Sequence, residues 1–196
     1  MQTRPYPKAD GEMCWLTREE QSQLLYAVRE EPERKIAYSL GLSGLRTDEI
    51  ISVTRDDVQP LSEDYALLIV QDGKTGKREV PIREETASLI RTYANARGIR
   101  KDEPVIEVIK RTLRNWLASD REVLGSDCLT MHDLRRTWAT DAYYSLAFDG
   151  VPIAETLVLS FGGWKHSDKG RQTFRENYLG PVPEHITTDA AAILFE

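Results

Sequence analysis

The sequence of 196 residues has two cysteines, no long apolar run and no excess of basic side chains. Cys14 and Cys128 have neither a C-x-x-C pair nor a His-rich segment beside them, so the sequence supports neither a disulfide framework nor a zinc site. No apolar segment approaches the roughly 18 residues of a membrane-spanning helix, and the N-terminus lacks the apolar core of a signal peptide. These absences favour a cytoplasmic protein that works without a membrane or a metal.

The net charge of −6 argues against nucleic-acid binding through an overall positive charge, because affinity for a duplex comes largely from neutralising phosphates. The charge is unevenly distributed, however. Acidic groups are dense at 10–31 and 184–196, whereas basic side chains recur at 74–78, 97–101, 110–114 and 135–136. Arginine outnumbers lysine more than two to one, and a guanidinium suits bidentate phosphate contacts. A local basic face is therefore compatible with the acidic total, which also suits a high-salt cytoplasm.

The hydrophobic periodicity predicts a mostly α domain with a small antiparallel sheet, an α+β fold. Thr17 and Glu20 form a capping box that opens a helix at 17–31. The apolar run 65–70, a turn with two glycines and the alternation around 80–82 predict a β-hairpin. Further helices are predicted at 32–42, 47–53, 84–97, 109–123, 131–147, 152–162, 173–178 and 188–195.

The chain is predicted to contain one domain with a segment on each side of it. Residues 1–11 are rich in proline and glycine and are interpreted as an arm. Residues 12–180 contain no repeat, low-complexity tract or linker and are predicted to form the domain. Residues 181–196 are a tail and a candidate contact with a partner protomer.

Six positions stand out because each lies at an element boundary, where packing in the core is a weak explanation. In chain order they fall in G-L-R-T-D-E-I, at the hairpin tip, in H-D-L-R-R (twice), in F-G-G-W and in T-F-R-E-N-Y-L-G. The residues are Arg46, Lys74, His132, Arg135, Trp164 and Tyr178.

This ordered set resembles the tyrosine recombinase (phage integrase) family, whose pattern is Arg, Lys in a hairpin, His-x-x-Arg, His or Trp, and Tyr. The resemblance covers about residues 14–180. It implies the catalytic-domain fold of that family and a site-specific recombinase that cleaves and rejoins double-stranded DNA as a homo-oligomer, a tetramer, without a cofactor. The F-G-G-W and T-F-R-E-N-Y-L-G segments are most similar to integrases of salt-loving archaea and their viruses.

The residue types suit cleavage of a phosphodiester without a metal. Arg46 and Arg135 are expected to hold the non-bridging oxygens of the scissile phosphate, because forked guanidiniums match the charge that builds up in the transition state. Tyr178 is expected to attack the phosphorus and form a 3′-phosphotyrosine, which a 5′-hydroxyl later displaces without ATP. Lys74 is the candidate general acid for the leaving 5′-oxygen.

Three further side chains complete the expected site. His132 is expected to assist deprotonation of the tyrosine or to hydrogen-bond a phosphate oxygen. Trp164 is expected to donate its indole N–H to a phosphate oxygen, as in family members with Trp instead of His at that position. Glu49 lies one helical turn past the first arginine and is expected to orient the groups around it.

Two of the basic residues have close rivals. Lys77 lies three residues after Lys74, and the family pattern leaves Lys77 as a DNA-backbone contact. Arg135 and Arg136 both lie within reach of His132 along a helix face. The resemblance selects Arg135 for the phosphate, and Arg136 is then expected to contact the DNA backbone.

The aromatic positions have rivals as well. His166 competes with Trp164, since the family more often has histidine there. Tyr178 follows Trp164 by fourteen residues, more than the usual family spacing, and the extra S-D-K-G-R residues are expected to form a surface loop. Tyr143 and Tyr144 lie in mid-helix and are interpreted as packing residues, which favours Tyr178 as the nucleophile.

Two other functions stay open. One is a catalytically silent DNA-binding regulator with the integrase fold, which is disfavoured because no catalytic position is lost. The other is a type IB topoisomerase-like strand relaxase, which the tail and the missing N-terminal clamp disfavour. Family integrases usually carry a DNA-clamping domain before the catalytic domain, so weak DNA affinity is expected of this chain alone.

Overall fold

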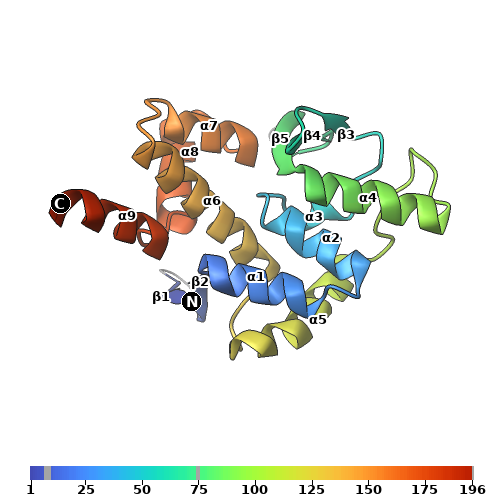
Figure 1. The fold of residues 1–196 in the computed structure, drawn as a ribbon, viewed down its shortest axis with the longest axis horizontal. Coiled ribbons are helices and arrows are strands. Elements are labelled where there is room, and N and C mark those ends of the chain that lie inside the picture. The colour runs from blue at the N-terminus through green and yellow to red at the C-terminus, as the bar shows by residue number, and fades with distance from the viewer. Residues whose placement is uncertain (7–9, 74–75, 196) are drawn as a thin grey trace.

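The computed structural model describes residues 1–6, 10–73 and 76–195. It is mostly helical with two small antiparallel sheets, which confirms the predicted α+β class (Figure 1). The elements are β1 (Gln2–Pro5), β2 (Glu12–Trp15), α1 (Arg18–Ala27), α2 (Pro32–Gly41), α3 (Thr47–Ile50), β3 (Val58–Pro60), β4 (Tyr65–Val70), β5 (Arg78–Arg83), α4 (Glu84–Arg97), α5 (Lys110–Asp120), the 3₁₀ helix η1 (Arg121–Leu124), α6 (Met131–Phe148), α7 (Ala154–Gly162), α8 (Asp168–Asn177) and α9 (Glu184–Phe195). No helix in the described ranges is long and apolar enough to cross a membrane.

The predicted hairpin is present as β4 and β5, paired antiparallel with Val70 opposite Arg78. The short strand β3 pairs with the other edge of β4 and was not predicted, because three residues with a proline give no periodic signal. The segment 1–11, interpreted as an arm, includes β1, which pairs antiparallel with β2. The chain therefore begins as a strand against the domain.

Several helix boundaries differ from the sequence prediction: α3 ends at Ile50 rather than 53, α9 begins at Glu184 rather than 188, and α1 and α8 differ as well. The capping box of Thr17 and Glu20 is confirmed, but α1 ends at Ala27 rather than near residue 31. The S-D-K-G-R stretch, expected to be a surface loop, belongs to α8, which begins at Asp168. Its N-cap is Ser167, whose side chain accepts a hydrogen bond from the Gly170 amide. This cap starts the helix before the glycine, which the sequence analysis took as a loop signal.

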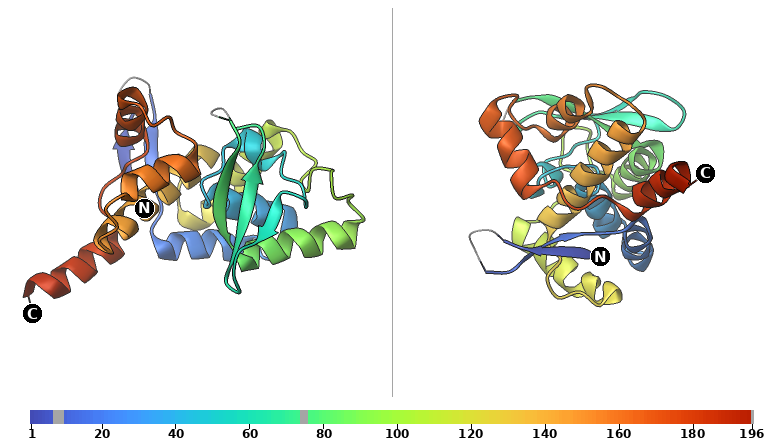
Figure 2. Two further views of the ribbon diagram at one scale, coloured as in Figure 1. Left: turned by 90° about the horizontal axis from the view of Figure 1, so that it is seen from above. Right: turned by 90° about the vertical axis from the view of Figure 1, so that its left-hand side faces the viewer.

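The long helix α6 joins two clusters of buried apolar side chains. The larger lies among α1, α2, α4, α5 and the three-stranded sheet, and the first turns of α6 contribute Met131 and Leu134 to it. The smaller contains Ala139 of α6 with buried side chains of α7 and α8, and Tyr178 packs against it. Figures 1 and 2 show α6 passing between the part that carries the sheet and the part formed by α7 and α8. The helix thus holds together the two parts that supply the site.

The N-terminal segment runs along one face of α6. The Cys14 amide donates to Asp133 Oδ1 (3.1 Å), and the Leu16 amide donates to Thr137 Oγ1 (3.0 Å). The two acceptors are four residues apart and so lie on the same helix face. Strand β2 is therefore fixed on α6 beside the helix turn that carries His132 and Arg135.

Candidate active site

Three arginines meet at the C-terminal end of α7. The backbone carbonyls of residues 161, 162 and 163 accept, in that order, from Arg78 Nε (2.8 Å), Arg135 Nη2 (2.6 Å) and Arg46 Nη2 (2.8 Å). The last carbonyls of a helix lack partners within the helix and carry the negative end of its dipole. The end of α7 is therefore a natural acceptor for guanidinium groups from three separate segments.

Glu49 supplies the negative charge beside these arginines. Its carboxylate is 5% exposed and receives two bonds from Arg78, at 2.8 and 2.7 Å, and two from Arg46, one through Nη1 and one through the backbone amide. Burial works to raise the pKa of Glu49, but its hydrogen bonds and the positive charges of Arg78 and Arg46 outweigh burial and lower it to about 2. The carboxylate therefore stays ionised and orients both guanidiniums.

Arg78 was missed by the sequence analysis. It opens β5 directly after the glycine turn, and in the sequence nothing separates it from the neighbouring lysines. Only the fold shows that it is buried and bridges Glu49 to the end of α7.

Two glycines allow this close approach of backbone and side chains. Gly44 has a φ of +90°, and a Cβ there would lie 2.5 Å from the Trp138 ring. At Gly162 a Cβ would lie 1.8 Å from the Trp164 ring. Both carbonyls accept from Arg135, so larger side chains at these positions would displace the acceptors of this arginine.

Arg135 is completely enclosed. Its Nη atoms donate to the carbonyls of Gly44 and Gly162, and its Nε has no hydrogen-bond partner among the described residues. The guanidinium carbon lies 4.2 Å from the centre of the Trp164 ring and 5.5 Å from that of Tyr178. Burial, and next the positive charge of Arg46, lower the pKa of Arg135 to about 9.

Tyr178 caps the C-terminus of α8 and lies between two predicted site residues. Its ring centre is 5.0 Å from that of His132 and 4.6 Å from that of Trp164. Burial and the charges of Arg136, Arg135 and Arg46 lower the pKa of His132 to about 3, so its imidazole is neutral at physiological pH. The structure thus brings together five predicted residues: Arg46, His132, Arg135, Trp164 and Tyr178.

The backbone around Tyr178 is held by residues that the sequence analysis did not assign to the site. Trp15 Nε1 and Thr140 Oγ1 both donate to the Tyr178 carbonyl, at 3.0 and 2.9 Å. Thr140 Oγ1 also accepts from the Gly180 amide at 2.8 Å. No sequence pattern connects these residues, because β2, α6 and the end of α8 meet only in the folded chain.

The expected DNA-backbone contact of Arg136 needs correction. Its side chain is 3% exposed, donates through Nε to the Asn177 carbonyl at 2.8 Å and pairs with Asp133. The helix periodicity could not show that this arginine faces the interior. Arg136 instead supports the segment that carries Tyr178, and the basic cluster 135–136 is not part of the surface.

Two of the remaining predicted residues, Lys77 and His166, lie at the surface. Lys77 is exposed next to β5, and Lys74 lies outside the described residues. His166 is exposed and hydrogen-bonds Ser160 Oγ at 3.1 Å, a placement that favours Trp164 as the residue beside the arginine. Tyr143 packs edge-on against Phe174 and Tyr144, in keeping with its interpretation as a packing residue.

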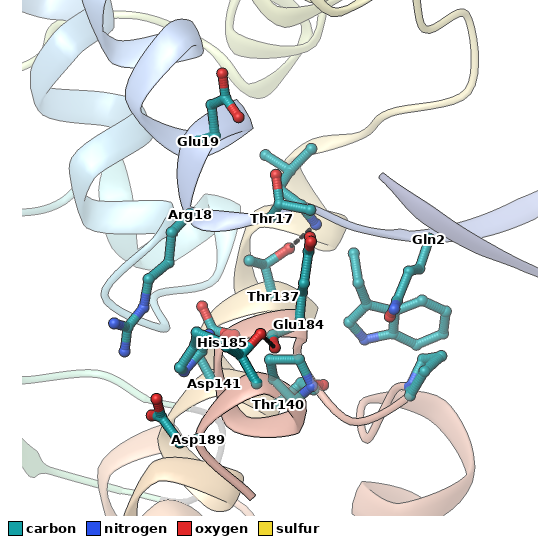
Figure 3. A pocket seen from close by; sticks show the side chains of 15 residues that line it. Gln2, Thr17, Arg18, Glu19, Thr137, Thr140, Asp141, Glu184, His185 and Asp189 are labelled. Carbon is teal, nitrogen blue, oxygen red and sulfur yellow. Dashed lines mark hydrogen bonds between the residues drawn. The ribbon is translucent and has the colours of Figure 1, made fainter. Parts of the chain in front are cut away.

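A cavity of about 440 Å³ lies beside the Tyr178 backbone, where β2 and α1 meet α6 and the start of α9 (Figure 3). Its lining includes Trp15 and Thr140, the two residues that hold the Tyr178 carbonyl, together with Asp141 and His185. Burial raises the pKa of Asp141. The first turns of α9 form one wall of this cavity through Glu184, His185 and Thr188.

Comparisons with known proteins rest on the fold. No protein-family model matches the sequence, and no curated protein matches it. Among solved structures, the chain is similar to XerA recombinase, with a TM-score of 0.68 and 20% identity over 93% of this chain and 65% of that one. It is also similar to the XerH site-specific recombinase bound to palindromic difH in a post-cleavage complex, with a TM-score of 0.64 and 15% identity over 94% of this chain and 54% of that one.

A third similar structure is the lambda integrase catalytic core, with a TM-score of 0.51 and 20% identity over 79% of this chain and 94% of that one. The chain spans between half and two thirds of the length of the two recombinases, and nearly all of the catalytic core is matched. The predicted fold is thereby confirmed: the chain has the tyrosine recombinase catalytic-core fold.

Proposed function

We propose that this chain is the catalytic part of a site-specific tyrosine recombinase or integrase that cuts and rejoins DNA through a 3′-phosphotyrosine on Tyr178. The observation that carries this proposal is the convergence of Arg46, His132 and Arg135 with Tyr178 beside the end of α7. The structural similarity to recombinases crystallised with DNA sites supports it. The resemblance to the tyrosine recombinases implies that the two arginines and the tyrosine of this set carry out the strand transfer.

The two phosphate-binding arginines start from different states. Arg46 keeps 21% of its side chain exposed and uses each Nη in one internal bond, so donors remain for a phosphate oxygen. Arg135 lies under the rings of Trp164 and Tyr178 and also uses each Nη in one internal bond, so its Nε and the second hydrogen of each Nη remain as donors for a phosphate. We therefore propose that the Tyr178 ring moves off Arg135 when the DNA phosphate enters.

The other roles follow from protonation and position. A neutral His132 beside Tyr178 suits a proton acceptor or a hydrogen bond to a phosphate oxygen. Trp164 is proposed as an indole N–H donor after the rearrangement. Lys74 remains the proposed general acid, and Lys77 the proposed contact with the DNA backbone.

The proposed partners are double-stranded DNA and further copies of this chain, in a cytoplasmic tetramer. One of the similar structures is a lambda integrase tetramer bound to a Holliday junction. In this chain α9 ends in three largely exposed apolar residues, Ile193, Leu194 and Phe195, which are proposed to contact a neighbouring protomer. The acidic composition supports the proposed kinship with integrases of salt-loving archaea and their viruses.

The test is covalent capture on DNA. A library of nicked duplexes, in which the cleaved end diffuses away, is incubated with the protein, and 3′-linked adducts are separated on a denaturing gel. We expect an adduct with the natural protein and with Tyr143→Phe, and none with Tyr178→Phe. An adduct with Tyr178→Phe would show that Tyr178 is not the nucleophile.

The same experiment separates the rival functions. DNA binding without an adduct at any salt concentration would favour a catalytically silent regulator. Relaxation of supercoiled DNA regardless of its sequence would favour a type IB topoisomerase-like enzyme.

A further inference from the structure

Cys14 and Cys128 lie side by side although 114 residues separate them in the sequence. Their Sγ atoms are 2.9 Å apart, and both are free thiols. Cys14 is completely buried in β2, whereas Cys128 is partly exposed in the loop between η1 and α6. No sequence pattern predicts this contact, because nothing along the chain relates the two positions.

The backbone of Cys14 is held in place by α6. Its amide donates to Asp133 Oδ1 at 3.1 Å, and the amide of Leu16, just after the strand, donates to Thr137 Oγ1 at 3.0 Å. Strand β2 is also paired with β1, with Cys14 opposite Thr3. The thiol of Cys14 therefore has little freedom to turn away from its neighbour.

Cys128 lies in a loop with its own anchors. Ser126 Oγ contacts Cys128 Sγ at 3.6 Å and accepts from the Leu129 amide at 3.3 Å. The Leu129 carbonyl accepts from Arg121 Nη1 at 2.9 Å. The loop thus presents the second thiol to the first as a fixed feature of the fold.

We propose that Cys14 and Cys128 form a reversible disulfide, a redox-responsive covalent link between β2 and the loop that leads into α6. A disulfide places the two sulfurs about 2.05 Å apart. The thiols therefore have to approach by only roughly 0.9 Å from their 2.9 Å separation, with both segments already in place.

The environments of the two thiols set the order of the reaction with a disulfide oxidant such as oxidised glutathione. Burial, the hydrogen bond with Cys128 and the charge of Asp133 raise the pKa of the Cys14 thiol well above its usual range. Cys14 is therefore unreactive toward an external oxidant, and the more accessible Cys128 reacts first.

The thiol–disulfide exchange with oxidised glutathione proceeds in two steps. Cys128, as thiolate, attacks one sulfur of oxidised glutathione and releases one reduced glutathione. Cys14 then loses its proton, attacks the Cys128 sulfur of the mixed disulfide and releases the second. Two protein thiols become one disulfide, and one oxidised glutathione gains the two electrons and two protons as two reduced glutathiones.

The link would join two segments that lead directly to residues of the candidate active site. Trp15, the residue after Cys14, donates to the Tyr178 carbonyl, and α6 begins three residues after Cys128 and carries His132. A bond that closes a loop of this length restricts the unfolded chain strongly. We expect the melting temperature to rise by on the order of 10 °C on oxidation.

The test treats the purified full chain with oxidised glutathione and measures intact mass, free thiols by maleimide labelling, and melting temperature. We expect the mass to fall by two hydrogens, both thiols to disappear without an adduct, and the melting temperature to rise. A reductant should reverse all three changes. DNA cleavage is not needed for any of these measurements, so the result is independent of the proposed function.

Single variants provide the matched controls. Cys14→Ser leaves Cys128 alone, and we expect it to stop with one glutathione attached. Cys128→Ser leaves only the buried thiol, and we expect it to remain unmodified. The proposal is overturned if the natural chain retains both free thiols after prolonged oxidation, stops at a single glutathione adduct, or forms the disulfide between two chains. The measurement on the natural chain decides even if a variant fails to fold.

Discussion

At the scale of single residues, Glu49 decides whether the arginines of the site can lie close together. It is the carboxylate that both Arg46 and Arg78 contact, and Arg135 lies on the neighbouring carbonyls. Like charges in a buried cluster are unfavourable unless a counter-charge is present. Glu49 is therefore expected to stabilise the fold as well as to orient the site.

Replacing Glu49 by Gln removes the charge and keeps the size of the side chain. The pKa of Glu49 is lowered from 4.5 to about 2. Its stabilising contribution is therefore fully present above pH 4.5 and is lost as the pH falls toward 2. We expect Glu49→Gln to lower the free energy of unfolding by about 3 kcal/mol at pH 7, and by much less at pH 2.

Urea unfolding at the two pH values measures this effect. Glu79→Gln is the matched control, because Glu79 is exposed on β5 next to Arg78. We expect the control to change stability by less than about 0.5 kcal/mol. Equal losses for Glu49→Gln at pH 7 and pH 2 would show that the charge is not responsible.

His132 gives a second prediction at this scale. With a pKa lowered from 6.5 to about 3, the folded chain keeps this imidazole neutral while the unfolded chain binds a proton. The stability that depends on neutral His132 is therefore complete above pH 6.5 and declines as the pH falls toward 3. Proton NMR of the imidazole, assigned with His132→Gln, should show no titration between pH 5 and 8. A midpoint near pH 6 would contradict the enclosed position of the ring.

At the scale of elements, the position of Tyr178 depends on contacts between β2, α6 and the end of α8. Trp15→Phe removes the indole N–H but keeps an aromatic ring against Gly180. We expect it to lower the free energy of unfolding by about 1 kcal/mol, the usual net value of one hydrogen bond. Amide hydrogen exchange should become faster in peptides that cover residues 174–181 and stay unchanged in α7.

Trp116→Phe is the control for this change, because Trp116 lies on α5 against the larger core. If it accelerated exchange at residues 174–181 as much as Trp15→Phe does, the effect would be global loosening. In that case the bond from Trp15 to the Tyr178 carbonyl would not be what holds the segment.

Most elements were predictable from sequence because their signals are local. The capping box of α1, the paired runs of β4 and β5 and the glycine turn before α3 are each readable over a few residues. Arg136 was expected at the surface but is buried, because helix periodicity does not show which of two adjacent arginines faces the interior. Arg78, Thr140 and the contact of the two cysteines were missed because they depend on segments that meet only after folding.

The family pattern predicted more of the site residues than helix periodicity and residue spacing did. Helix spacing alone left Arg135 and Arg136 equivalent, and no spacing rule connected Tyr178 with His132. The structure places the Tyr178 ring close to both His132 and Arg135, and the last carbonyls of α7 hold the Arg135 guanidinium. Long-range convergence of this kind comes from topology, which a single sequence encodes only indirectly.

At the scale of the whole molecule, α9 extends from the domain with the C-terminus at its far end (Figure 1). Ile186 in its first turns is the only residue of the described helix that is buried. Ile193, Leu194 and Phe195 at the other end are 68%, 75% and 87% exposed. An apolar helix end that stays this exposed is suited to a contact with another protomer.

We therefore predict that Ile193→Glu combined with Leu194→Glu leaves the domain folded and impairs its assembly on DNA. The melting temperature should change by less than about 2 °C, since neither side chain packs on the core. Sedimentation of the protein with a duplex identified by the proposed covalent capture should show higher-order complexes for the natural chain and only one protomer per site for the variant. Thr187→Glu combined with Thr188→Glu, which adds the same charge to exposed positions nearer the domain, should still assemble. If both double variants assemble like the natural chain, α9 does not provide the contact between protomers, and the interface has to lie on the body of the domain.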